Sequence, residues 1–266
     1  MNKQLTRVQH FIPRFILKRF LSSGDINFFD KRYKKFLSKT PKGSMYKEYF
    51  YEHDDFSPNE IEDLLASREN IYSPIIDKVL AGEKLTFDDY KILIEFRHIT
   101  YYRSNEFMGF HTYKKDRGEG SSHQRLEWLR INGIYESKDV EKDIKRSQLK
   151  AIQNVISGQD AAYQMSIRTP LCFVLTSADT KFAIGDNGSI SMGEEFEGFT
   201  VITISPSHAI AFPRTATAIE LMKGMGISGQ ESTVEYQEID NELVGLINKR
   251  VRDHAFEYYV DPNPKV

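Results

Sequence analysis

Polar and apolar residues alternate near the start of the chain. The segments 25–37 and 44–52 are rich in aromatic residues at nearly every second position, and Pro41, Lys42 and Gly43 lie between them. A period of two is typical of strands with one buried face, and Pro and Gly favour turns. The pattern therefore predicts N-terminal antiparallel strands.

Helical spacing replaces this alternation after Ser57. Apolar residues then recur every three or four positions as far as Gly82, which predicts one or two helices with Ser57 as the N-cap. Thr86 is the predicted N-cap of a further helix that reaches about residue 108. Helices are also predicted over 123–131 and 138–165, and an exposed loop over 114–122. Together these segments form a central helical block.

Short runs of β-branched and aromatic residues return after Pro170. They are separated by Gly, Asn, Asp and Pro, which predicts a second strand block at about 170–213, and residues 240–259 have the apolar spacing of a C-terminal helix. This order contains no long linker and no regular alternation of strands with helices. We therefore expect a single α+β domain over 1–266, in which the two strand blocks flank or join around the central helices.

The composition is that of an ordinary globular protein, with 40% hydrophobic and 28% charged residues among 266. Cys172 is the only cysteine, which excludes an intrachain disulfide and zinc sites built on paired cysteines, and favours a reducing, cytoplasmic compartment. No apolar run approaches the roughly 20 residues of a membrane-spanning helix. We therefore expect no membrane partner.

Basic residues are concentrated at the start of the chain. The net charge of -2 divides into +9 over residues 1–50, from 12 Lys and Arg against 3 Asp and Glu, and -11 over the rest. Lys31, Arg32, Lys34 and Lys35 lie there among aromatic residues, a combination that can hold a phosphate backbone and stack bases. The alternative is a structural hairpin whose aromatic face is buried and whose lysines keep its edge from pairing with other chains.

The N-terminal segment also carries a motif of regularly spaced residues. His10, Pro13, Leu17 and Phe20 fit the signature H-x-x-P-x-x-x-L-x-x-F, and the runs INFFDK and YFYE follow. This order resembles DUF4238, a largely prokaryotic family of domains of unknown function. Further matches keep the family's order: Glu62 and Glu69 at its paired glutamates, Arg103 and Ser104 at its Arg-Thr-Pro, KFAIGDNG (181–188) at its F-x-x-S-D-N-P strand and turn, and ISP (204–206) with AIAF (209–212) at its PLSP strand.

The chain departs from the family pattern at three positions. Gly185 stands where the family has serine, and Gly188 and Asn105 stand where it has proline. Any role of those family side chains does not carry over to this chain. The resemblance spans roughly residues 8–213 and implies a shared fold. It implies no activity, because the function of the family is not established.

Four polar residues within these motifs are candidates for a catalytic site: His10, Arg103, Asp186 and Asn187. The near-neutral pKa of histidine suits proton transfer, and arginine can neutralise an anionic substrate. Asp186 can act as a base, a metal ligand or an orienting carboxylate, with Asn187 as a polar substrate contact. Each motif also has a structural alternative: a histidine bonded to backbone, an arginine paired with Glu62 or Glu69, and a tight turn at Asp186-Asn187-Gly188.

Two functions fit these features. The first is a hydrolytic enzyme acting on phosphodiester or nucleic-acid substrates, in which His10 is acid or base, Asp186 orients it or binds a metal, and Arg103 offsets phosphate charge. The second is a non-enzymatic regulatory module that binds nucleic acid or an acidic protein through the basic, aromatic N-terminal hairpin. The enzyme requires the three side chains to converge, whereas the module requires only an exposed basic face. The sequence identifies no metal, cofactor or oligomeric state and leaves open whether the protein is an enzyme.

Overall fold

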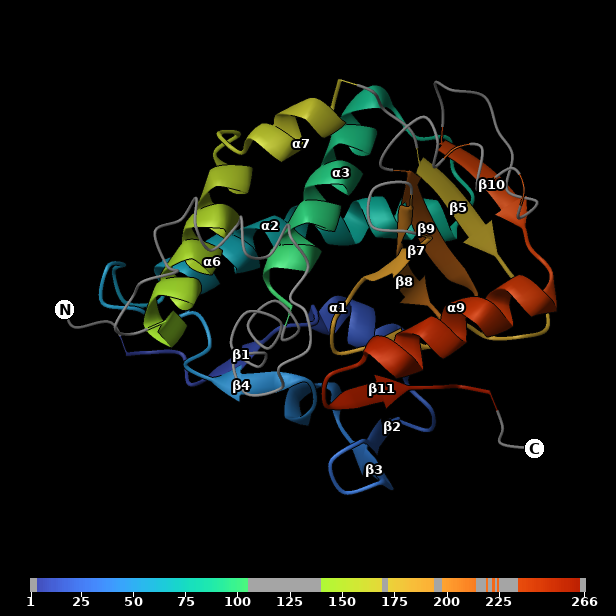
Figure 1. The fold of residues 1–266 in the computed structure, drawn as a ribbon, viewed down its shortest axis with the longest axis horizontal. Helices are drawn as coiled ribbons and strands as arrows, with labels where there is room; N and C mark the ends of the chain where they lie inside the picture. Colours follow the sequence, from blue (N-terminus) through green and yellow to red (C-terminus); the bar gives the residue numbers. More distant parts are fainter. Residues whose placement is uncertain are drawn as a thin grey trace.

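The structure is a computed structural model that describes residues 4–104, 140–168, 172–193, 198–213 and 234–263, together with 219, 222 and 224. The loop predicted over 114–122 and the helix predicted over 123–131 lie outside these residues. The fold is α+β, as predicted, with strands at the N-terminus, a helical block, a second group of strands and a late helix (Figure 1).

The elements follow one another in this order. The N-terminal group contains β1 (Val8–His10), α1 (Arg14–Leu17), η1 (Lys18–Phe20), β2 (Ile26–Asp30), β3 (Lys35–Lys39), η2 (Pro41–Gly43) and β4 (Tyr46–Glu48). The helical block contains α2 (Glu60–Leu80), α3 (Phe87–Tyr102), α6 (Val140–Ile156) and α7 (Ala161–Ser166). The last group contains β5 (Cys172–Thr176), β6 (Ile184–Gly185), β7 (Ile190–Met192), β8 (Phe199–Ser205), β9 (His208–Pro213), β10 (Val234–Glu238), α9 (Asn241–His254) and β11 (Tyr258–Val260).

The predicted capping residues lie at or near the starts of the helices in the structure. Thr86 caps α3 through a complete capping box, in which its side chain accepts from Asp89 N–H and the Asp89 carboxylate accepts from Thr86 N–H. The Glu60 carboxylate accepts from Ser57 N–H at 2.9 Å, although the N-cap of α2 is Asn59 rather than Ser57. The predicted helix over 138–165 is interrupted after Ile156 and continues as α7.

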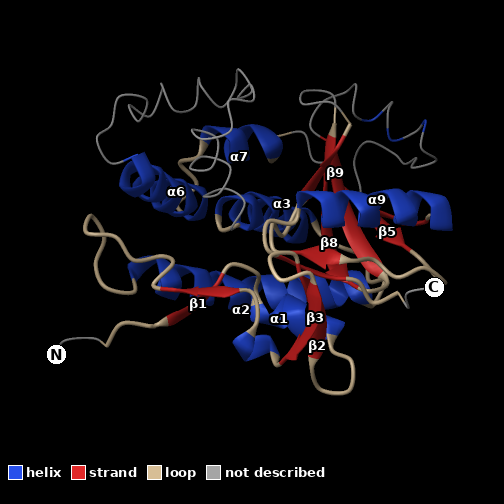
Figure 2. Cartoon of the chain, turned by 60° about the horizontal axis from the view of Figure 1, so that its bottom comes forward, coloured by secondary structure: helices blue, strands red, loops and turns tan. Residues whose placement is uncertain are grey.

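The described strands form three sheets. The largest has the order β10-β5-β9-β8-β7, with β10 parallel to β5 and its other pairs antiparallel. A four-stranded antiparallel sheet has the order β3-β2-β11-β6, and β1 pairs with β4. The N-terminal strands therefore join a strand of the second block, through β11. Figure 1 shows α9 running beside β11, and Figure 2 shows the hairpin β2–β3 projecting on the side away from α6 and α7.

Several predicted elements differ in extent from the structure, and the helix predicted to reach about residue 108 ends as α3 at Tyr102. The segment 25–37 is two strands rather than one, because the Asp30 carboxylate accepts from the backbone N–H of Arg32 and Tyr33 and Lys34 has a φ of 50°, which together turn the chain. The helix predicted over 240–259 ends at His254. Residues 258–260 form β11 instead, since both β2 and β6 pair with them.

Candidate functional site

The turn at 186–188 lies where the segments that carry His10, Arg103 and Asp186 pack against one another. Gly188 has a φ of +70°, which favours glycine, and its N–H donates to the Gly185 carbonyl at 3.1 Å. A Cβ on Gly188 would lie 2.8 Å from Cγ2 of Thr100 and 3.1 Å from Cδ1 of Ile12. Ile12 belongs to the His10 motif and Thr100 lies in α3 just before Arg103. The segments that carry His10, Arg103 and Asp186 are therefore packed together.

Arg103 ties two of these segments to α2. Its buried guanidinium donates to the His10 carbonyl at 2.7 Å, to Oε1 of Glu69 at 2.8 Å and to the Tyr51 hydroxyl at 3.3 Å. Burial lowers the pKa of Arg103, but Tyr51 and Glu69 raise it more, so its net pKa lies above the ordinary value. The structural pairing of Arg103 with a glutamate of α2 is confirmed, and the partner is Glu69.

Glu62, the alternative partner predicted for Arg103, is a further ionisable group near this cluster. It lies two helical turns before Glu69 on the same face of α2. Burial raises the pKa of Glu62 to about 7, against the lowering effect of Arg103 and with a further increase from Glu69. Glu69 therefore holds the ion pair with Arg103, and Glu62 lies within electrostatic range of both groups.

The His10 imidazole faces backbone rather than another candidate side chain. Its Nε2 lies 3.1 Å from the Pro41 carbonyl, and its ring centroid is 5.9 Å from that of Tyr46. Burial lowers the pKa of His10 to about 4, although the Pro41 carbonyl raises it. The imidazole is therefore neutral at physiological pH, with Nε2 donating to Pro41. Among the described residues no hydrogen bond joins His10 to Asp186.

The Asp186 carboxylate holds the chain reversal between α9 and β11. It accepts from the backbone N–H of Phe256 at 2.7 Å, of Glu257 at 2.6 Å and of Tyr258 at 3.0 Å. Burial raises the pKa of Asp186 to about 6, although these three N–H groups lower it. The turn predicted at Asp186-Asn187-Gly188 is confirmed, and the carboxylate projects from it into the fold rather than toward a shared pocket with His10.

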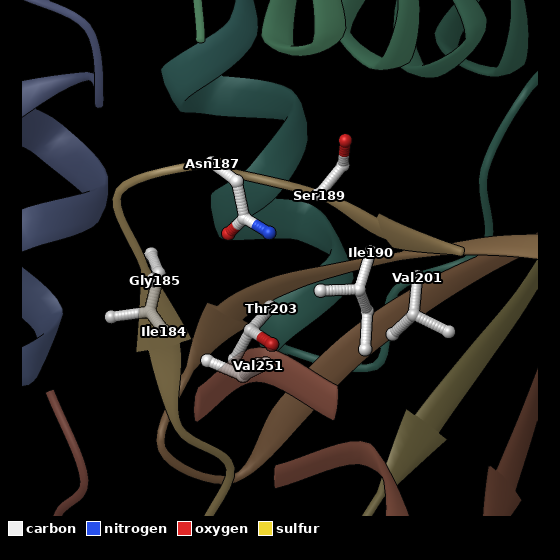
Figure 3. Close-up of a pocket in the computed structure, with 9 residues that line it drawn as sticks. Ile184, Gly185, Asn187, Ser189, Ile190, Val201, Thr203 and Val251 are labelled. Carbon is white, nitrogen blue, oxygen red and sulfur yellow. The ribbon is translucent and has the colours of Figure 1, made fainter. Parts of the chain in front are cut away.

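Asn187 faces a small cavity of about 10 Å³, lined also by Gly185, Ile190, Thr203 and Val251 among others. Figure 3 shows its amide directed into this space, whereas the Ser189 hydroxyl points away. Asn187 is buried, and its Nδ2 has no hydrogen-bond partner among the described residues. The space suits one water molecule and is too small for a substrate. Within the described part of the chain, no three or more His, Cys, Asp and Glu side chains are grouped so that they could hold a metal ion.

The four basic residues predicted to bind nucleic acid separate into two pairs. Lys31 donates from Nζ to the carbonyls of Arg252 at 3.0 Å, Asp253 at 3.3 Å and Ala255 at 2.6 Å, so it stabilises the C-terminal end of α9. Arg32 forms ion pairs with Asp30 and Glu257 and donates to the Tyr258 hydroxyl. Lys34 and Lys35 remain exposed.

Comparison with known proteins gives one match. A family model described as "Protein of unknown function (DUF4238)" matches residues 8–261. No curated protein and no solved structure matches the chain significantly. Among the described residues, no helix combines the length and the apolar character needed to cross a membrane.

Proposed function

The chain belongs to the DUF4238 family of proteins of unknown function, and we propose that it is a non-enzymatic module that binds nucleic acid on the hairpin β2–β3. Two features disfavour the hydrolytic alternative. The His10 imidazole is neutral and bonded to backbone, and the Asp186 carboxylate is occupied by three N–H groups of the chain. Neither side chain is directed at a common substrate position.

The exposure of basic and aromatic side chains on the hairpin carries this proposal. Tyr33 is 68% exposed and Phe36 is 49% exposed, and Lys34, Lys35 and Lys39 are exposed beside them. Burying apolar rings usually stabilises a fold, so rings left in water at one place favour a partner there. Lysines beside these rings would neutralise phosphates and release the counterions condensed on them.

The position of the hairpin also suits an extended polyanion. Among the described strands β3 is the outermost of its sheet, and its lysines Lys35 and Lys39 are exposed. Lys35 lies over the Tyr33 ring, with Nζ 5.4 Å from the ring centroid. This arrangement holds a charge and a stacking surface side by side. An acidic protein would use the same charges, whereas each nucleotide brings both a phosphate for the lysines and a base whose flat face can stack on the rings.

The proposal is tested by measuring binding of a labelled oligonucleotide across a salt series by fluorescence anisotropy. The variant Lys34→Gln/Lys35→Gln/Lys39→Gln removes three hairpin charges. Its slope of log affinity against log salt should be flatter by about 2–3, since each phosphate contact contributes about 0.7–0.9. The control Lys18→Gln/Lys84→Gln/Lys150→Gln removes the same charge from exposed sites elsewhere and should leave the slope unchanged.

Three results would refute the proposal. The first is that the wild type binds no nucleic acid even at low salt, and the second is that the hairpin and control variants lose affinity equally. The third is that polyglutamate binds as tightly as the oligonucleotide and competes with it, which would identify an acidic protein as the partner.

A further inference from the structure

Aromatic side chains form a row across three strands of the four-stranded sheet. In the register of this sheet Phe36 of β3 is opposite Phe29 of β2, and Phe29 is opposite Tyr259 of β11. Residues directly opposite each other in antiparallel strands project from the same face. The ring centroids of Phe36 and Phe29 are 5.1 Å apart, and those of Phe29 and Tyr259 are 5.3 Å apart. We call Phe36, Phe29 and Tyr259 the aromatic strip.

The aromatic strip is open to solvent at one end. Phe36 at the sheet edge is exposed, whereas Phe29 and Tyr259 are half-buried. The neighbouring pair on the same face is Asn27 opposite Ser38, both exposed and polar. Tyr259 packs against the hydrophobic core that includes Val251, so the core explains this ring. A solvated sheet face normally carries polar side chains, and the core does not explain the rings of Phe29 and Phe36 in the same way.

The other end of the aromatic strip adjoins the C-terminal end of α9. Tyr259 is opposite Gly185, and a Cβ on Gly185 would lie 3.4 Å from Cγ1 of Val251 on that helix. α9 also carries Lys249 and Arg250, which are exposed but project from other faces of the helix than Val251, since one and two residues correspond to about 100° and 200° of rotation. At the hairpin turn Lys34 borders the aromatic strip, whereas Lys35 and Lys39 alternate with Phe36 along β3 and start from the other face of this edge strand.

We propose that the aromatic strip stacks the bases of a single-stranded nucleic acid, while the exposed lysines of the hairpin contact its phosphates. This inference rests on the proposed function and narrows its ligand class. Unpaired bases expose the flat faces that aromatic rings stack on, whereas a duplex buries these faces between its own base pairs. Phe36, as the most exposed ring, should contribute most.

Substitution of the rings separates stacking from charge. Phe36→Leu and Phe29→Leu keep apolar side chains for packing but remove the flat ring faces. Each should weaken binding of short oligothymidine by about tenfold, while the salt slope and duplex affinity stay unchanged because no charge is lost. The matched control is Phe87→Leu, which removes an exposed phenylalanine on α3 and should leave affinity unchanged. Circular dichroism confirms that each variant is folded.

The outcomes distinguish the stacking inference from the proposed function. If single strands and duplex bind equally and Phe36→Leu weakens neither, stacking is refuted while salt-dependent binding through the hairpin lysines stands. If neither nucleic acid binds at low salt, both are refuted. As a second readout, ultraviolet cross-linking to a 5-iodouracil oligonucleotide should attach it to Phe36, Phe29 or Tyr259. Cross-links confined to other parts of the chain would overturn the inference.

Discussion

The Asp186 carboxylate gives the sharpest test of whether this residue is structural or catalytic. Asp186→Ala removes the acceptor of three backbone N–H groups that hold the reversal between α9 and β11. A catalytic carboxylate can usually be removed with little loss of stability, whereas a carboxylate that organises a chain reversal cannot. The free energy of unfolding therefore separates the two roles.

The magnitude follows from two opposing terms. Each buried N–H left without an acceptor costs about 1–3 kcal/mol, hence about 3–9 kcal/mol for three. Burial of the carboxylate opposes this term, since it raises the pKa of Asp186 from 3.8 to about 6. At about 1.36 kcal/mol per pKa unit, this upward shift of the pKa costs the wild type about 3 kcal/mol of stability at neutral pH, and the variant does not bear this cost. We expect Asp186→Ala to lower the free energy of unfolding by about 3 kcal/mol at neutral pH, or the Tm by about 6–12 °C.

Urea unfolding followed by circular dichroism measures this loss, and Asp179→Ala, which removes an exposed aspartate, is the control. The pH dependence gives a second check. Because the folded pKa is raised, the stability that this group contributes is largest below about pH 4 and is lost as pH rises through about 6. The difference in free energy of unfolding between wild type and variant should thus decrease by about 3 kcal/mol as pH rises through that window. An unchanged Tm, together with loss of a nuclease activity found in the wild type, would refute the structural reasoning.

Two further substitutions test the surroundings of the same turn. His10→Asn keeps a donor for the Pro41 carbonyl but does not titrate. Burial lowers the pKa of His10 from 6.5 to about 4, so the free energy of unfolding of the wild type should fall by about 3 kcal/mol as pH falls through this window, and that of the variant should not. Urea unfolding of both proteins at each pH measures this difference. An equal loss of stability in the two proteins would contradict the expectation. Gly188→Ala should destabilise more than Gly82→Ala, by about 1–3 kcal/mol, since both glycines have φ near +70° but only Gly188 lies against Thr100; equal melting temperatures for the two variants would exclude the steric explanation.

The sequence predicted those parts of the fold that depend on local signals. The N-cap residue Thr86 and the apolar spacing after it predicted the start of α3, and short runs of β-branched and aromatic residues predicted the strand block that runs from Cys172 to Pro213. The end of α9 could not be predicted in this way. Its last residues continue a helical pattern, and the strand that replaces it pairs with β2 and β6, both distant in sequence.

The candidate site was predictable only in part for the same reason. The family motifs identified three segments, and these are packed together around Gly188. Whether their side chains face one another depends on tertiary contacts, such as those of Asp186 with the chain after α9. The aromatic strip was not predicted at all, because it requires the register of β11 against β2.

The place of β11 between β2 and β6 has a consequence for how the protein is made. During synthesis the hairpin β2–β3 leaves the ribosome more than 200 residues before its neighbour in the sheet. Until Tyr258–Val260 emerge, β2 has an open edge and Phe29 lacks its contact with Tyr259. Contacts this distant in sequence close slowly. The aromatic surface of the nascent chain is therefore incomplete until residues 258–260 have emerged and paired with β2.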